Sequence, residues 1–500
     1  MSKQILFGEN ARTSILKGFK KTAEAIIGTL GPCGQNVFID DPYTPRITND
    51  GATIANSISF PDKFENLGAW IVKNTSSQTN DDVGDGTTTT AVLLNGIVDE
   101  ALNSSENPMM IKVSLQEAVK EVVKKIKESS TPITKDDVYK IALISSENEE
   151  IAKIVSLVIN NIGKDGVVKV EESKTFETYF EMQEGYKADV GFISPHFAND
   201  GKGAEAIYSD VLVLCCQKKI STLGDLKFFD LLKKEEVGQL VIVCEDIDQS
   251  ILGVLIANKM QGFFSSLVVR ANGSNLEDIA ATVGATIISE GNGKNYNNLT
   301  LEDFGKAEKV ICGQKETLFI AKKGAEQANR LKAIAETIDN QFEKKALIER
   351  AAKLTGGIAV IKIGALTDTD RGYKKDKTDD TVAAVKAALT EGIVEGGGMT
   401  LWRISEAMEA KTTGEKILKT ALKAPLQTII KNCGKEYQEV IDKMPAGEGY
   451  DARNDKYVKM IDNGIIDPAK VERVSLENAV SNASLFITAH CAITDAPIEK

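Results

Sequence analysis

One stretch of ten residues, Asp81–Thr90, combines three acids, two glycines and four consecutive threonines. Glycine lets a backbone come close to an anion. Apolar residues recur with helical spacing from Ala91 to Ala101, which predicts that the threonines begin a helix, where free amides and the helix dipole favour phosphate. Because clustered carboxylates repel phosphate, we expect one of them, Asp85, to hold Mg²⁺. The stretch predicts a nucleotide phosphate site, although a simple turn and capped helix would also suit it.

Other side chains suited to chemistry are scarce. The chain has only two histidines, His196 and His490, too few for a multi-histidine metal site or a serine–histidine pair. Its seven cysteines include no C-x-x-C pair, and their odd number fits neither a disulfide framework nor a structural zinc site. We therefore expect reduced thiols and a chemistry run by carboxylates and metal. The cysteines are Cys33, Cys215, Cys216, Cys244, Cys312, Cys433 and Cys491.

Length and charge narrow the class of protein. With 500 residues, the chain is expected to hold about three domains. Its net charge of −12 argues against nucleic acid or an anionic membrane as a partner, since either needs a basic face. Residues 1–15 show no apolar signal-peptide core, and no apolar run is long enough to span a membrane. We expect a cytoplasmic protein.

The predicted secondary structure around the phosphate site changes along the chain from mainly helical to mixed and back to helical. Helical periodicity dominates from about residue 10 to 130 and again after about 380. Between about 165 and 365, strand-like and helical segments alternate, which predicts an α/β module inserted into a helical domain made of both chain ends. The predicted strands are Val167–Val170, Val211–Leu214, Leu240–Val243, Leu267–Val269, Thr286–Ile288 and Ile358–Ile363, with a hairpin of Asn36–Ile39 and Arg46–Thr48. The later predicted helices are Thr381–Thr390, Thr400–Ala410, Pro425–Cys433 and Leu476–Ala489.

Glycines occur near the places where this character changes. They would serve either as ordinary loop residues or as hinges between domains, because glycine absorbs large backbone changes. These glycines are Gly185, Gly356, Gly357 and Gly392.

Several short motifs follow one another along the chain: Thr29–Pro32 (TLGP), Thr48–Gly51 (TNDG), Asp62–Gly68 (DKFENLG), Gly84–Thr89 (GDGTTT), Gly396–Gly398 (GGG) and Met460–Pro468 (MIDNGIIDP). Together they resemble the motifs of a known family, the group I (GroEL-type) chaperonins. The resemblance covers essentially the whole chain, and several motifs in the right order are far more specific than one glycine motif. It implies a multidomain α and α/β fold with a mainly helical equatorial ATPase domain, a small intermediate hinge domain and an inserted α/β apical domain. The implied segments are 1–131 and 392–500 (equatorial), 132–184 and 357–391 (intermediate) and 185–356 (apical).

The resemblance also implies the residues of a nucleotide site. Asp85 matches the Mg²⁺ ligand, Asp380 the carboxylate that activates the attacking water, and Asp50 a second acid near that water. Asp380 is expected to open a helical stretch. The implied nucleotide-binding residues are Thr29, Leu30, Gly31, Pro32, Asn49, Asp85, Gly86, Thr87, Thr88, Thr89, Gly397, Asp451, Ala452, Arg453, Ile465 and Asp467. Thr29, Asn49 and Thr88 match the surroundings of a monovalent-cation site, which implies K⁺ beside ATP and Mg²⁺.

The chain departs from the family pattern in places. Asn49 stands where a lysine is usual, so the positive charge beside the cation site is missing. Asp451 and Arg453 replace smaller or neutral residues on the adenine side. Val190 stands where an arginine often pairs with an acid, which leaves the matching Asp368 without that partner. The strength of nucleotide binding and the coupling between subunits are therefore expected to differ from the family norm.

A polypeptide-binding surface is implied in the apical segment. Ile251–Ala257 is apolar almost all the way round, so the helix is either buried on both sides or exposes an apolar face. By resemblance, Leu252 and Ile256 are exposed binding positions and Leu255 points inward. In the preceding helix, Lys227 and Asp230 replace usual leucines, and Phe228 is expected to serve as a shifted contact. The implied binding residues are Phe192, His196, Phe197, Leu226, Phe228, Leu252, Leu255, Ile256 and Ala257.

These features predict an ATP-dependent chaperone that captures unfolded polypeptide and releases it into a closed ring cavity. The resemblance implies a homo-oligomer of seven-membered rings, single or double, with a GroES-like co-chaperonin lid. Two other classes stay open: a metabolic ATPase or small-molecule kinase, and a ring scaffold that binds nucleotide without turnover. The apolar apical helices argue against the first, and the retained Asp50, Asp85 and Asp380 against the second.

Overall fold

Both ends of the chain build the same part of the molecule. A computed structural model describes residues 3–40, 45–163, 166–173, 175–183, 185–201, 204–289, 291, 293–321, 324–337, 340, 343–344, 347, 350–351, 353–354 and 358–496. The chain divides into two compact units. The first contains Met1–Asn160, Val170–Tyr179 and Lys362–Lys500, and the second contains Asn161–Lys169 and Phe180–Ile361. The predicted insertion of an α/β module into a helical domain is thus confirmed, whereas the finer division into equatorial and intermediate segments stays a prediction.

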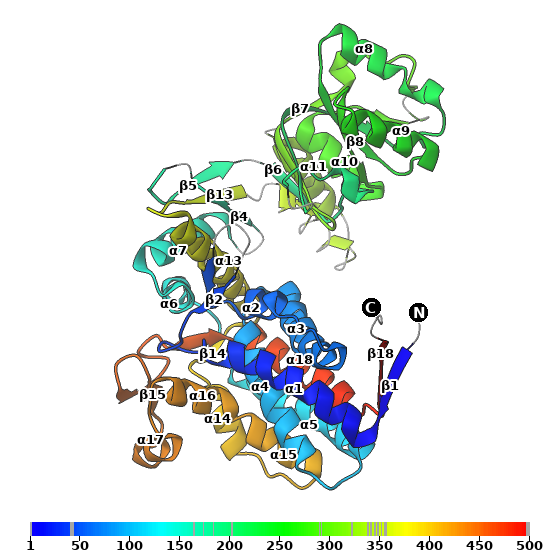
Figure 1. Ribbon diagram of the computed structural model, residues 1–500. Coiled ribbons are helices and arrows are strands. Elements are labelled where there is room, and N and C mark those ends of the chain that lie inside the picture. The colour runs from blue at the N-terminus through cyan, green and yellow to red at the C-terminus, as the bar shows by residue number, and fades with distance from the viewer. Residues whose placement is uncertain are drawn as a thin grey trace. The chain divides into compact units, whose positions relative to one another are not determined.

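The first unit is mainly helical (Figure 1). Its helices are α1 (Gly8–Ile27), α2 (Gly51–Ser57), α3 (Lys63–Val83), α4 (Thr87–Leu102), α5 (Pro108–Ser129), α6 (Lys135–Ser146), α7 (Glu149–Ile162), α13 (Asp368–Glu391), α14 (Met399–Glu406), α15 (Thr413–Ala421), α16 (Ala424–Asn432), α17 (Tyr437–Lys443) and α18 (Ala469–Ile487). Its short strands pair as β1 (Lys3–Phe7) with β18 (Cys491–Asp495), β2 (Val37–Ile39) with β3 (Arg46–Thr48), β14 (Ile393–Glu395) with β17 (Ile466–Pro468), and β15 (Gly449–Asp451) with β16 (Lys456–Val458). The predicted hairpin is therefore present as β2 and β3.

Helices α4 and α18 form the centre of this unit, side by side although far apart in sequence (Figure 1). Both are buried over most of their length, and each fully buried aliphatic side chain contributes about 1.5–3 kcal/mol to folding. Helices α1 and α3 also cross closely. A Cβ atom added at Gly18 would lie 1.8 Å from the Glu65 carbonyl oxygen, and one at Gly68 would lie 1.9 Å from that of Ile15. Glycine is required at this crossing because the two backbones touch there.

The second unit is built around one mixed sheet. The strand order is β6 (Gly185–Ala188), β12 (Thr317–Ile320), β11 (Gly305–Cys312), β7 (Ala206–Cys216), β8 (Gln239–Cys244) and β9 (Ser265–Arg270), and β10 (Ile287–Ile288) also pairs with β7. Strands β7, β8 and β9 run parallel, and their near-continuous apolar sequences are typical of strands buried on both faces. The helices of this unit include α8 (Phe228–Lys234), α9 (Gln249–Met260), α10 (Gly273–Val283) and α11 (Gly324–Glu336).

The remaining strands occur where the chain passes between the units. β4 (Val167–Glu172), β13 (Ile358–Ile363) and β5 (Tyr179–Gln183) form a three-stranded sheet in that order. All six strands predicted in the middle of the chain are therefore present. The predicted hinge residues Gly356 and Gly357, and residues 41–44 of the hairpin turn, lie outside the described residues. Within the described part of the chain, no helix is both long and apolar enough to span a lipid bilayer.

Two predictions about local structure need correction. Asp380 does not open a helix, because α13 already begins at Asp368 with Thr367 as its N-cap. The first half of α13 is rich in charge and lacks an apolar stripe, which hid it from periodicity. Ion pairs one turn apart support it, including Lys374–Asp370 at 3.1 Å and Lys375–Asp379 at 3.3 Å.

The second correction concerns the cysteines. Cys33 and Cys433 form a disulfide across 400 residues of sequence, so the prediction of reduced thiols is wrong for this pair. Cys215, Cys216, Cys244, Cys312 and Cys491 are free. Burial in the sheet of the second unit raises the pKa of the Cys244 and Cys312 thiols to about 12, which keeps them protonated.

Candidate functional site

A cavity of about 540 Å³ in the first unit collects residues from both chain ends. All the nucleotide-binding and catalytic residues named from the sequence line it, from the Thr29–Pro32 loop to Asp467. Their roles stay predictions, but their common location is a property of the fold. The lining also includes residues that were not assigned to the site from the sequence: Gly51, Lys140, Leu143, Ile144, Ser145, Glu147, Lys377, Gly398, Pro425, Ile429, Tyr450, Asn454, Asn463, Gly464, Pro468, Val471, Glu472 and Ser475.

The N-terminus of α4 faces this cavity. Gly86 is the N-cap, with a left-handed φ of +79°, and the helix begins at Thr87 as predicted. A Cβ atom on Gly86 would lie 2.6 Å from both Ser475 Oγ and Val471 Cγ1, so position 86 requires glycine for both conformation and space. The first amides of a helix have no partner within the helix. This end of α4 can therefore bind an anion.

The Thr29–Pro32 loop approaches α4 from the end of α1. Thr29 Oγ1 lies 3.4 Å from Thr88 Oγ1 and donates to the Ile26 carbonyl at 2.8 Å. Gly31 has a φ of +85°, and a Cβ atom there would lie 3.0 Å from Ile429 Cγ1 of α16. Asn432 of the same helix donates through its amide to the carbonyls of Ile27 and Leu30. Helix α16, which periodicity predicted only as a helix, thus holds this loop in place.

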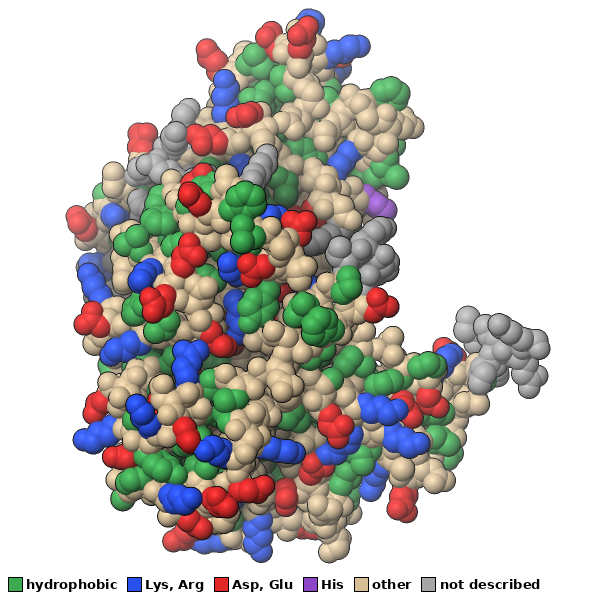
Figure 2. All heavy atoms as spheres, turned by 60° about the vertical axis from the view of Figure 1, so that its left-hand side comes forward, with side chains coloured by type: hydrophobic (Ala, Val, Ile, Leu, Met, Phe, Trp, Pro, Cys, Tyr) green, Lys and Arg blue, Asp and Glu red, His purple; other side chains and the backbone are tan. Residues whose placement is uncertain are grey.

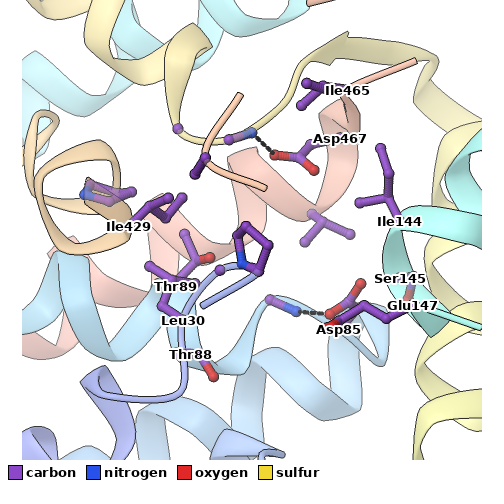
Figure 3. Close-up of a pocket in the computed structure, with 18 of the residues that line it drawn as sticks. Leu30, Asp85, Thr88, Thr89, Ile144, Ser145, Glu147, Ile429, Ile465 and Asp467 are labelled. Atoms are coloured by element: carbon purple, nitrogen blue, oxygen red, sulfur yellow. Dashed lines mark hydrogen bonds between the residues drawn. The ribbon is translucent and has the colours of Figure 1, made fainter. Parts of the chain in front are cut away.

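Three aspartates converge beside the start of α4. Asp85 accepts a hydrogen bond from its neighbour Gly86 N at 2.6 Å (Figure 3). Asp50 caps α2 by accepting from Thr53 N at 2.7 Å, and it accepts from Thr87 Oγ1 at 3.3 Å. Burial raises the pKa of Asp85 and of Asp380, and the neighbouring carboxylates raise both further. A bound cation would relieve this repulsion.

The donor set fits a hard cation, since Asp85 and the threonine hydroxyls are oxygen ligands. Among the described residues, no group of three or more His, Cys, Asp and Glu side chains converges as a metal site. Lys377 is a cation already present in the lining. Its ammonium lies 3.3 Å from Glu147 Oε1, and its charge acts on both Asp85 and Asp380.

On another wall of the cavity, Asp467 in the middle of β17 accepts from Gly397 N at 3.1 Å (Figure 3). Gly397 has a left-handed φ of +66°. Glu472, in the first turn of α18, is hydrogen-bonded to Asp467 and only 5% exposed. Glu472 was not predicted from the sequence, because its only signal is a place five residues after Asp467.

The loop between β15 and β16 forms the remaining side. Asp451 accepts from Arg453 N at 3.0 Å and from Asn454 Nδ2 at 2.7 Å, so its carboxylate is engaged in shaping its own loop. Arg453 lies 3.9 Å from Glu147. The disulfide between Cys33 and Cys433 connects the loop after α1 to the end of α16.

Asp368, whose usual arginine partner is replaced by Val190, has another ion-pair partner in the structure. Its carboxylate pairs with Arg371, one turn later in α13, at 2.8 Å. The resemblance left Asp368 without an arginine partner, and the structure supplies one from the same helix. Asn49, another of the departures, forms a side-chain hydrogen bond with Tyr373.

The residues named for polypeptide binding lie in the second unit, and their exposure differs. His196 and Ala257 are exposed, whereas Leu226, Leu252 and Ile256 are partly buried against the core of that unit. Leu255 is buried, as expected for an inward position. Exposed apolar side chains that the sequence analysis did not name lie nearby in the chain, at Leu223, Met260 and Phe263.

Besides Leu255, three of the named residues are buried, which argues against direct contact with a client. Phe192 and Phe197 are 8% and 0% exposed. Phe228 is 2% exposed and lies against Phe229, Tyr296 and Phe304, so it belongs to the core, and its assignment as a shifted surface contact is wrong. Phe229 is the more exposed of the two phenylalanines.

Figure 2 shows acidic and basic side chains interspersed over the face in view, with no large basic area. Together, these observations place a helix start that can bind an anion and three converging aspartates in the first unit, and exposed apolar side chains in the second.

Comparison with known proteins identifies the family. The sequence model of the TCP-1/cpn60 chaperonin family matches residues 22–225 and 230–497, and the chain therefore belongs to this family. Two crystal structures of the chaperonin gp146 from the bacteriophage EL 2 (Pseudomonas aeruginosa), in the presence of ATP-BeFx, share its fold. One is 19% identical with a TM-score of 0.73 and the other 20% identical with a TM-score of 0.67, and each match covers 99% of both chains. The chaperonin fold implied by the sequence motifs is thus confirmed.

Proposed function

We propose that this chain is an ATP-hydrolysing chaperonin that captures unfolded polypeptide on its second unit. The observation that carries the proposal is the convergence of Thr29–Pro32, Asp50, Asp85–Thr89, Asp380 and Asp467 on one cavity in a member of this family. Sites that bind nucleotide phosphates need free amides, an oxygen-bound cation and no bulky side chain near the anion. The cavity supplies the amides at α4 and the glycines at positions 31 and 86.

In this proposal, each wall of the cavity binds a different part of the nucleotide or a cation. The start of α4 holds the phosphates, and Asp85 holds Mg²⁺, which would neutralise charge on the transferred phosphoryl group. Asp380 orients and deprotonates the attacking water, with Asp50 beside it. Asp467 binds the ribose, and the β15–β16 loop with Ile465 lies on the adenine side. Thr29, Asn49 and Thr88 surround a monovalent cation such as K⁺.

The direct test combines turnover with imaging of the purified full-length chain. We expect ATP-dependent phosphate release and seven-membered rings in negative-stain images, as single or double rings that accept a GroES-like lid. Rings without turnover would favour the nucleotide-binding scaffold. Turnover by a monomer that phosphorylates a small molecule would favour the kinase.

Client capture is proposed to depend on the partly exposed apolar residues of α9. Leu252→Ser or Ile256→Ser should abolish suppression of the aggregation of a denatured test protein, because each removes apolar contact area from the binding face. Rings and ATPase activity should stay intact. Light scattering measures the suppression, and Leu366→Ser, at a leucine 82% exposed elsewhere in the chain, is the matched control.

Because Phe228 is buried, we expect its replacement to lower the stability of the second unit rather than to remove a client contact. Phe228→Ser should unfold the second unit at lower temperature, since loss of a buried aromatic side chain costs about 3–5 kcal/mol. Calorimetry distinguishes this loss of stability from the loss of capture at Leu252 and Ile256. Normal capture by both α9 variants would contradict the proposed surface.

A further inference from the structure

The ribose side of the cavity contains two carboxyl groups, of which the family resemblance explains one. Asp467 is the middle residue of β17, and Glu472 lies in the first turn of α18. Both line the cavity. Glu472 is 5% exposed, and its Oε2 atom is buried with no hydrogen-bond partner among the described residues. A buried carboxylate oxygen without a partner carries a large desolvation cost, and a protonated carboxyl avoids most of it.

Contact between the two carboxyl groups also indicates that one of them is protonated. Asp467 accepts from Gly397 N at 3.1 Å and is hydrogen-bonded to Glu472. Two carboxyl groups in hydrogen-bond contact need a proton between them, because neither carboxylate can donate. Burial and the charge of Asp85 raise the pKa of Asp467 to about 6. Burial and the charge of Asp467 raise the pKa of Glu472 to about 8. The pair therefore holds one proton at neutral pH, on Glu472.

The charged groups around the pair are engaged elsewhere. The cations in the same lining are Lys140, which pairs with Asp137, and Lys377 and Arg453, which both lie against Glu147. On α18 itself, Arg473 binds Glu391 and Glu477, and the charge of Lys470 acts on Glu391. From α3, Asp82 accepts from Asn478 at 3.3 Å. Asp85, before α4, is the further acid that acts on Asp467.

We propose that Glu472 is a positioning residue of the sugar site, which donates its proton to Asp467 and holds that carboxylate toward the ribose hydroxyls. This inference rests on the proposed binding of ATP in the cavity. The pair then carries a single negative charge, and Asp467 keeps a free lone pair for the sugar. Loss of the Glu472 proton would place a second negative charge in a cavity that must also admit an anionic ligand, so nucleotide affinity should fall above about pH 8.

Isothermal titration calorimetry with Mg²⁺ and ATP on the full chain tests this directly. Wild-type affinity should fall about tenfold between pH 7 and pH 9, as expected when binding requires a proton on a group with a pKa of about 8. Glu472→Gln is a neutral isostere that can still donate to Asp467. It should keep wild-type affinity at pH 7 and lose the alkaline fall. Glu477→Gln, on the same helix but outside the cavity lining, should keep the wild-type profile.

Glu472→Leu removes the donor without adding charge. It should weaken ATP binding about tenfold at pH 7 while circular dichroism shows an unchanged fold. An alkaline fall in Glu472→Gln equal to that of wild type would overturn the inference, and so would wild-type binding that is flat up to pH 9. If wild type bound no ATP at any pH, the proposed function itself would be wrong.

Discussion

Asp380→Ala should lower ATP turnover by about two orders of magnitude or more while ATP affinity stays near normal. Loss of a general base typically costs about 10²–10⁴ in rate. Affinity should not fall, because Asp380 repels the neighbouring carboxylates of Asp50 and Asp85 and would repel phosphate as well. Phosphate release measures turnover, and calorimetric titration measures affinity.

A neighbouring residue provides the matched control. Asp379→Ala removes an exposed acid that pairs with Lys375 in the same helix, outside the cavity lining, and should leave turnover unchanged. Asp85→Ala should instead weaken binding of Mg²⁺-ATP, since it removes the proposed metal ligand. If Asp380→Ala and Asp85→Ala lost ATP binding equally, the division of roles between them would be incorrect.

Deletion of Ala492–Lys500 should convert rings into monomers. Within the chain, β18 pairs with β1 in an antiparallel register from Lys3–Asp495 to Phe7–Cys491. The pair leaves Ile5, Phe7 and Ile493 between 47% and 60% exposed, and Phe38 of the β2–β3 hairpin is 73% exposed. Open strand edges with apolar residues need to be covered. We propose that the hairpin of a neighbouring subunit covers them.

Sedimentation velocity distinguishes the two outcomes. A shorter deletion, of residues 497–500 alone, keeps all of β18 and should leave the rings intact; these four residues lie outside the described part of the chain. Intact rings after removal of Ala492–Lys500 would show that subunits associate through other surfaces. The buried side chain of Ala492 also contacts the helical core, so circular dichroism should confirm that the helices remain.

The start of α4 could be predicted from the sequence because its signals are local. A left-handed glycine, an aspartate and a row of threonines before an apolar helical pattern define the start of α4 within ten residues. The central strands were equally predictable, since strands buried on both faces are apolar throughout. The motif resemblance then indicated which distant segments join α4, and the structure brings all of them to one cavity.

What the sequence left open depends on contacts between distant segments or on the rotation of a helix. Asp380 was named, but its place in the middle of α13 was hidden by a charged first half that only ion pairs support. Phe228 and Phe229 are neighbours on α8, and one residue turns a helix by about 100°. Periodicity in so short a helix could not tell which ring is buried, and packing against Tyr296 and Phe304 decided it.

The carboxyl pair and the disulfide also depend on contacts between segments that are distant in the sequence. Sequence alone predicted a helix start suited to phosphate and a helical domain made of both chain ends, because those signals lie in short, periodic segments. Only the tertiary structure placed the Glu472 carboxyl against Asp467 and brought Cys33 and Cys433, 400 residues apart, into a bond. Both depend on how β17, α16 and α18 pack around the cavity, and such packing energies are shared among many residues rather than encoded in any one segment.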